Sequence, residues 1–158
     1  MPDDKALREH LAKLLNGADA HVDFEHAMAD FPADLRGKTP KGAEHSPWEL
    51  LEHLRIAQHD ILDFSTNAGY KEKEWPKDYW PATAEPPDPK AWDRSINAYC
   101  EDLKALCSLV EDGKTDLFAK IPHGDGQTIL REALVVADHN SYHLGQLVLL
   151  RRQLGAWK

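Results

Sequence analysis

The sequence predicts an all-α protein, a four-helix bundle with one long crossover loop between its second and third main helices. Apolar residues recur at helical spacing in four segments, and no stretch shows the alternation typical of a strand. Stretches rich in proline and glycine separate these segments. The length of 158 residues fits a single domain spanning 1–158, and 42% hydrophobic residues are enough for a core.

The first part of the chain predicts two short helices. Residues 4–15 place leucines on one face, and an Asn-Gly pair ends this segment. Asp23 is a suitable cap for a second helical piece that runs to about Phe31. Residues 32–45 contain two prolines and two glycines and are therefore expected to form a loop.

Three longer segments complete the predicted bundle. Segment 46–67 begins with Ser-Pro-Trp-Glu, in which serine is the cap, proline the first helical residue and glutamate the partner in a capping box. The next helix is expected over 88–112, started by an Asp-Pro pair. Thr128 is expected to cap the last helix, which ends near residue 154.

The connection 69–90 between two of these helices is predicted to be irregular, because it holds five of the ten prolines. A loop of this length inside a compact domain usually has a function. Two interpretations are open. Its aromatic residues plug one end of the bundle, or the loop brings Trp75, Tyr79 and Trp80 to the mouth of a pocket for a small, partly apolar ligand.

Three of the nine histidines lie on the apolar stripes of predicted helices. His139 and His143 are four residues apart, which places their side chains on one helical face about 5–6 Å from each other. His53 lies on the stripe of helix 46–67. Three imidazoles from facing helices form the ligand set typical of catalytic zinc, with one position open. Zinc or nickel is the expected divalent ion, with iron or manganese as further candidates.

Other polar residues on or near these stripes are candidates for supporting roles. Glu132, Gln146, Glu49 and Asp60 could orient an imidazole by hydrogen bonding or act as a general base. The alternative is a solvated position at the end of the bundle, which is favoured for Asp60 and Glu49. Tyr142 is expected to point to another face of its helix. The six remaining histidines, which include His45 and His59, are expected on loops or solvent-facing positions. They are therefore not predicted to bind metal.

Composition and motifs exclude several function classes. A net charge of −8 leaves no basic surface for nucleic acid, and no apolar run is long enough to span a membrane. No secretory signal is recognisable. Cys100 and Cys107 are seven apart on a predicted helix, beyond disulfide reach, and are expected to be buried free thiols in a reducing, cytoplasmic compartment. The motifs of zinc peptidases, serine hydrolases, P-loop proteins and CxxC redox proteins do not occur.

Two stretches resemble the DinB/YfiT-like superfamily of damage-inducible proteins. SPWELLEHLRIAQHDILDF (46–64) is similar to its second helix, and ADHNSYHLGQLVLLR (137–151) to its last. The resemblance covers essentially the whole chain and implies a four-helix bundle that holds a divalent metal on His53, His139 and His143. It also implies a homodimer, an expectation strengthened by three tryptophans that one small core does not obviously need, at positions 48, 92 and 157.

The expected function is that of a metalloenzyme with a small-molecule pocket at the three histidines. The metal would act as a Lewis acid on a bound water or thiol, and some relatives are S-transferases or isomerases that use low-molecular-weight thiols. A thiol-dependent S-transferase or a hydrolase is therefore expected. Two alternatives remain at this stage: a non-catalytic, stress-related protein with a structural metal, and a dimeric interaction protein whose histidines only line the core.

Overall fold

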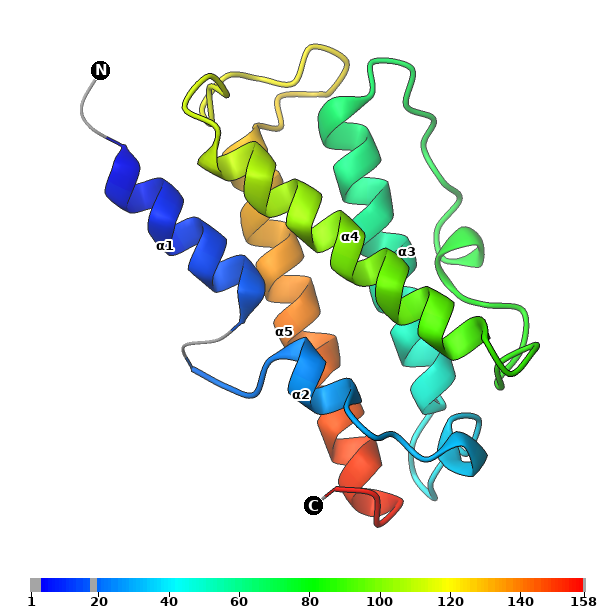
Figure 1. Cartoon of the computed structure of the whole chain (residues 1–158). Coiled ribbons are helices and arrows are strands. Elements are labelled where there is room, and N and C mark those ends of the chain that lie inside the picture. Colours follow the sequence, from blue (N-terminus) through cyan, green and yellow to red (C-terminus); the bar gives the residue numbers. More distant parts are fainter. Residues whose placement is uncertain (1–3, 18–19, 158) are drawn as a thin grey trace.

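Four long helices form the body of the protein in this computed structural model: α1 (Lys5–Asn16), α3 (Pro47–Thr66), α4 (Ala91–Glu111) and α5 (Ile129–Gln153) (Figure 1). The connections contain a short helix, α2 (Phe24–Met28), and two 3-10 turns, η1 (Ala33–Leu35) and η2 (Lys77–Tyr79). The structure describes residues 4–17 and 20–157, and these ranges contain no β-strand. The all-α fold class is therefore confirmed.

The helix starts follow the predicted capping chemistry with one exception. At the start of α3, Ser46 and Glu49 form the predicted capping box, and the side chains of Asp23 and Thr128 cap α2 and α5. The prediction was wrong for α4, which begins at Ala91 and has no side-chain cap. Asp88 instead accepts a hydrogen bond from the Lys90 amide and forms an ion pair with Arg94, so it closes the turn before the helix.

Two apolar clusters fill the bundle, and both involve α4 and α5. One joins α2 and the first half of α3 to α4 and α5, and the other joins α1 to the opposite halves of α4 and α5. Trp48 and Trp92 are buried in the first cluster, and Trp157 packs against it. The three tryptophans therefore pack within the monomer, which removes the argument that they are left over for a dimer interface.

The crossover loop runs along the outside of α3 and is attached to it at several points (Figure 1). The hydroxyl groups of Tyr70 and Tyr79 donate to the Asp60 carboxylate, at shortest distances of 3.2 and 2.6 Å. Near its other end, the Ala84 carbonyl accepts a hydrogen bond of 2.5 Å from the Ser46 hydroxyl. These contacts hold the loop against the face of α3 that carries His53.

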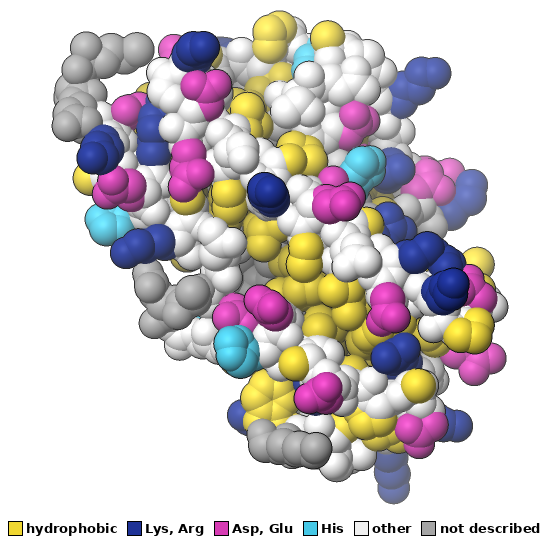
Figure 2. Space-filling model, viewed as in Figure 1, with side chains coloured by type: hydrophobic (Ala, Val, Ile, Leu, Met, Phe, Trp, Pro, Cys, Tyr) yellow, Lys and Arg dark blue, Asp and Glu magenta, His cyan; other side chains and the backbone are white. Residues whose placement is uncertain are grey.

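One side of α4, formed by Ile96, Cys100 and Leu103 at helical spacing and called its outer side below, is not fully buried. Figure 2 shows apolar side chains gathered beside α4, with charged side chains around them. Cys107 is buried as expected, but Cys100 is exposed, so the expectation of a buried thiol was wrong for Cys100; both are free thiols. No helix in the described part of the chain is long and apolar enough to cross a membrane.

Candidate metal centre

Three histidines from two helices meet between α3 and α5. His53 extends from α3, and His139 and His143 extend from successive turns of α5. Their potential ligand nitrogens all lie within 4.8 Å of one another, and the Nε2 atoms of His53 and His139 are 3.1 Å apart. Two nitrogens bound tetrahedrally to one zinc, at the usual bond length, lie about 3.3 Å apart. The cluster is therefore close to the geometry that a shared ion requires.

The burial of the three side chains differs along the cluster. His53 is only 2% exposed, between the apolar residues of α3, whereas His139 and His143 are half-buried. The cluster is thus closed by the bundle on the α3 side and accessible from the α5 side. Such an arrangement suits ligands that are held rigidly but can be reached by a small molecule.

Hydrogen bonds fix the orientation of two of the imidazoles. His53 Nδ1 donates to the Tyr79 carbonyl at 2.9 Å, and His143 Nδ1 donates to Gln146 Oε1 at 2.7 Å. A carbonyl oxygen can only accept, so the proton lies on Nδ1 and the lone pair on Nε2. Both rings therefore present Nε2 as a ligand, with the support that metal-binding histidines normally receive.

Aromatic rings surround the histidines. The Trp80 indole stacks on His53 with ring centres 4.0 Å apart and an angle of 3°, and His45 also stacks on this indole at 4.0 Å. Trp75 lies 6.3 Å from His53, and the Tyr142 ring meets His143 edge-on at 4.9 Å. These rings exclude water from one face of His53 and form the walls of the cluster.

Burial sets the protonation state of the cluster. Removal from water lowers the pKa of His53, His139 and His143. For His139 the pKa falls to about 4, with the neighbouring His143 and His53 adding to the effect of burial. The three imidazoles are therefore neutral at pH 7, which is the form that binds metal ions.

The four residues predicted to support the histidines take different positions. Gln146 contacts His143 directly. Glu49 completes the cap of α3, Asp60 accepts hydrogen bonds from the two loop tyrosines, and buried Glu132 forms an ion pair of 2.5 Å with Arg131. Among the described residues, Gln146 is thus the one of these four that forms a hydrogen bond with a histidine of the cluster. Within the same residues, Asp60 is connected to the cluster only through Tyr79.

The three loop aromatics lie beside the cluster, together with two residues that sequence reasoning missed. Trp80 covers His53, Trp75 lies nearby, and Tyr79 contributes its backbone carbonyl. The missed residues are His45, which directly precedes the cap of α3, and Tyr142, whose ring reaches back to its neighbour. Proximity in sequence to His53 and His143 is the signal that could have identified both.

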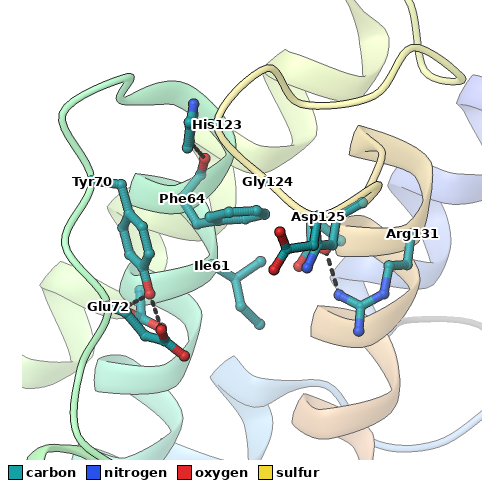
Figure 3. Close-up of a pocket in the computed structure, with 11 residues that line it drawn as sticks. Ile61, Phe64, Tyr70, Glu72, His123, Gly124, Asp125 and Arg131 are labelled. Atoms are coloured by element: carbon teal, nitrogen blue, oxygen red, sulfur yellow. Dashed lines mark hydrogen bonds and ion pairs between the residues drawn. The ribbon is translucent and has the colours of Figure 1, made fainter.

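A pocket of about 390 Å³ lies beyond Asp60, toward the end of α3. Figure 3 shows Phe64 and Tyr70 on one side of it, Arg131 on the other, and Asp125 between them. None of the three histidines lines this pocket. Its lining also lacks Gln146 and Trp80, and in the described part of the chain it meets the cluster only through Asp60 and Tyr79.

Comparison with known proteins agrees with the resemblance found in the sequence. A family model of the DinB superfamily matches residues 18–147, a range that contains all three histidines. Neither a curated protein nor a solved structure gives a significant match.

Proposed function

This chain belongs to the DinB superfamily, and from this membership and the histidine cluster we propose that it is a metalloenzyme acting on a small molecule. One divalent ion would be held by His53, His139 and His143. Zinc or nickel suits three imidazoles best, with iron or manganese as further candidates. The observation that carries the proposal is the convergence of three neutral imidazoles, two of them oriented through Nδ1.

The number of ligands favours a catalytic role over a structural one. Within the described residues, the group that could hold an ion contains these three histidines and no fourth histidine, cysteine or carboxylate. Structural zinc sites are closed by four protein ligands, whereas catalytic sites keep one position open for water or substrate. This count supports an enzyme over the non-catalytic, stress-related alternative.

The chain's own residues would hold and shield this centre. Tyr79 and Gln146 keep His53 and His143 in the ligating tautomer, and Trp80 covers one face of His53. A bound ion would supply Lewis-acid chemistry, which lowers the pKa of a bound water or thiol. We propose a low-molecular-weight thiol as the nucleophile, which makes the chain an S-transferase; with water as the nucleophile it would be a hydrolase.

A pair of histidine variants on the same helix tests the metal site. His53→Ala should lower zinc affinity by more than about 100-fold, beyond the usual effect of losing a supporting residue. His59→Ala is the matched control, because His59 is on α3 but pairs with Asp102 at the surface. Zinc affinity is measured by competition with a chromophoric chelator. Equal affinities of His53→Ala and wild type would contradict the proposal.

A substrate screen tests the proposed reaction. Zinc- or nickel-loaded protein is incubated with low-molecular-weight thiols and a panel of small electrophiles, and thiol consumption and products are followed by mass spectrometry. The S-transferase proposal expects thiol conjugates that form with wild type and with His59→Ala but not with His53→Ala. Hydrolysis products without thiol consumption would favour the hydrolase. Full metal loading without any turnover would favour the non-catalytic alternative.

A further inference from the structure

A second hollow adjoins the histidine cluster on the side of α5 that faces the start of α3. It has a volume of about 300 Å³ and is lined by residues of the segment 42–45, by Leu50 and by the second half of α5. This volume is at the lower end of the range typical of small-ligand pockets. The hollow could therefore hold part of a small molecule.

Two residues connect this hollow to the cluster. Gln146 lines the hollow, and its amide oxygen accepts the hydrogen bond from His143 Nδ1. His45 also lines it and stacks on the Trp80 indole, which in turn stacks on His53. The hollow is thus separated from His143 by the Gln146 side chain alone and from His53 by His45 and Trp80. A ligand at the cluster would have to extend past Gln146 to reach it.

The hollow is apolar except beside His45 and Gln146 and at two exposed polar residues. Leu50 and Leu150 are buried and form its apolar walls, whereas Leu149 is 54% exposed beside it. Glu44 and Gln153 also line it and are exposed. A carboxylate here disfavours an anionic substituent, and an exposed leucine gains from contact with an apolar one. The hollow therefore suits an aliphatic chain.

The cluster itself prefers the opposite chemistry. Three neutral imidazoles leave the double charge of a bound ion uncompensated, and no carboxylate belongs to the group within the described residues. An anionic head, such as a thiolate or carboxylate, is then the favoured occupant of the open position. The two adjoining environments together define an amphiphilic ligand.

We propose that the site binds small molecules with an anionic, metal-binding head and an aliphatic tail, and that the hollow beside Leu149 holds the tail. This inference rests on the proposed metal site. It specifies the class of substrate, because a chain of several methylenes should raise affinity whereas a polar or charged substituent of the same length should not.

Hydroxamates provide the probes, because their anionic head binds zinc and their tail can be varied. Binding of acetohydroxamate and hexanohydroxamate to the zinc-loaded protein is measured by calorimetry. Each buried methylene is worth about a fourfold gain in affinity, so the longer probe should bind at least about tenfold more tightly. Leu149→Asp should remove most of this gain and leave the affinity for acetohydroxamate unchanged.

Leu134→Asp is the matched control, since Leu134 is also on α5 and is 46% exposed but does not line the hollow. This variant should keep the full gain, and both variants should keep their zinc. Equal binding of the two probes to wild type, or a gain that persists in Leu149→Asp, would overturn the inference while leaving the metal site intact. Failure of zinc and of both probes to bind would instead reject the proposed function on which the inference rests.

Discussion

Individual hydrogen bonds decide whether three histidines can act as one ligand set. His143 donates to Gln146 and His53 to the Tyr79 carbonyl. The role of Gln146 was predictable because it lies three residues after His143 on a helix, where side chains meet. The role of Tyr79 was not, because a backbone acceptor in an irregular loop has no signature in the side-chain sequence.

The effect of replacing Gln146 on metal affinity should depend on whether the new side chain can still accept the hydrogen bond from His143. Gln146→Leu removes the acceptor for His143 Nδ1 and should lower zinc affinity by about 10–100-fold, whereas Gln146→Glu keeps an acceptor and should retain it. Gln153→Leu, at an exposed position farther along α5, should have no effect. Chelator competition measures all three variants. An unchanged affinity of Gln146→Leu would show that this hydrogen bond does not support the metal.

The protonation of His139 should make the metal-free protein sensitive to acid. Burial lowers its pKa to about 4 in the folded state, with His143 and His53 contributing, while the unfolded chain keeps the ordinary value of 6.5. Between these values the unfolded state binds more protons, so stability falls as pH decreases from about 6.5 to about 4. The loss of Tm between pH 7 and pH 5, measured with a chelator present, should be smaller in His139→Gln. An equal loss in both proteins would place the acid sensitivity elsewhere.

At the scale of elements, the caps and apolar periodicity predicted the helices well. The capping box of α3 and the caps of α2 and α5 are local features, and they are present as predicted. The predicted start of α4 was too early, because the Asp88 side chain accepts a hydrogen bond from the Lys90 amide in the turn before the helix begins. The path of the crossover loop depends on contacts between distant residues, such as Tyr79 with Asp60, and periodicity cannot reveal those.

Of the two tyrosines that donate to Asp60, only Tyr79 should affect metal affinity, because its carbonyl accepts the hydrogen bond from His53. Burial and then Asp60 raise the pKa of the Tyr79 hydroxyl, which stays protonated and donates to that carboxylate. Tyr79→Phe removes this bond and should loosen the carbonyl that orients His53, lowering zinc affinity by about tenfold. Tyr70→Phe is the control, because Tyr70 also donates to Asp60 but its carbonyl accepts no hydrogen bond from a histidine among the described residues. Equal zinc affinities of the two variants would disprove this coupling.

At the scale of the whole molecule, we propose that two copies pair through the outer side of α4. Ile96, Cys100 and Leu103 lie there at helical spacing and are half-buried or exposed, in keeping with the apolar side chains gathered beside α4 (Figure 2). Sedimentation equilibrium should give twice the monomer mass of 17.9 kDa. Cys100→Arg should shift the protein to monomer, whereas Ser108→Arg, at an exposed position farther along α4, should not. A monomeric mass at micromolar concentrations would reject the dimer.

The position of the histidine cluster follows from the arrangement of the bundle. The spacing of His139 and His143 and the apolar stripe around His53 predicted which residues would approach one another, and packing of α3 against α5 brings their ligand nitrogens within 4.8 Å. The hollow beside Leu149 could not be predicted in this way, because it is formed where the irregular segment 42–45 passes α5. Local patterns therefore define the ligands, and the packing of irregular segments defines the space around them.

X-ray absorption spectroscopy of the zinc-loaded protein tests the central claim most directly, because it reports the atoms bound to the ion. Three imidazole nitrogens at about 2.0–2.1 Å and one further oxygen or nitrogen ligand are expected, without sulfur. The imidazole signal should decrease in His53→Ala and remain in His59→Ala. Sulfur at about 2.3 Å, or a shell with fewer than three imidazoles in the wild-type protein, would contradict a centre built from His53, His139 and His143.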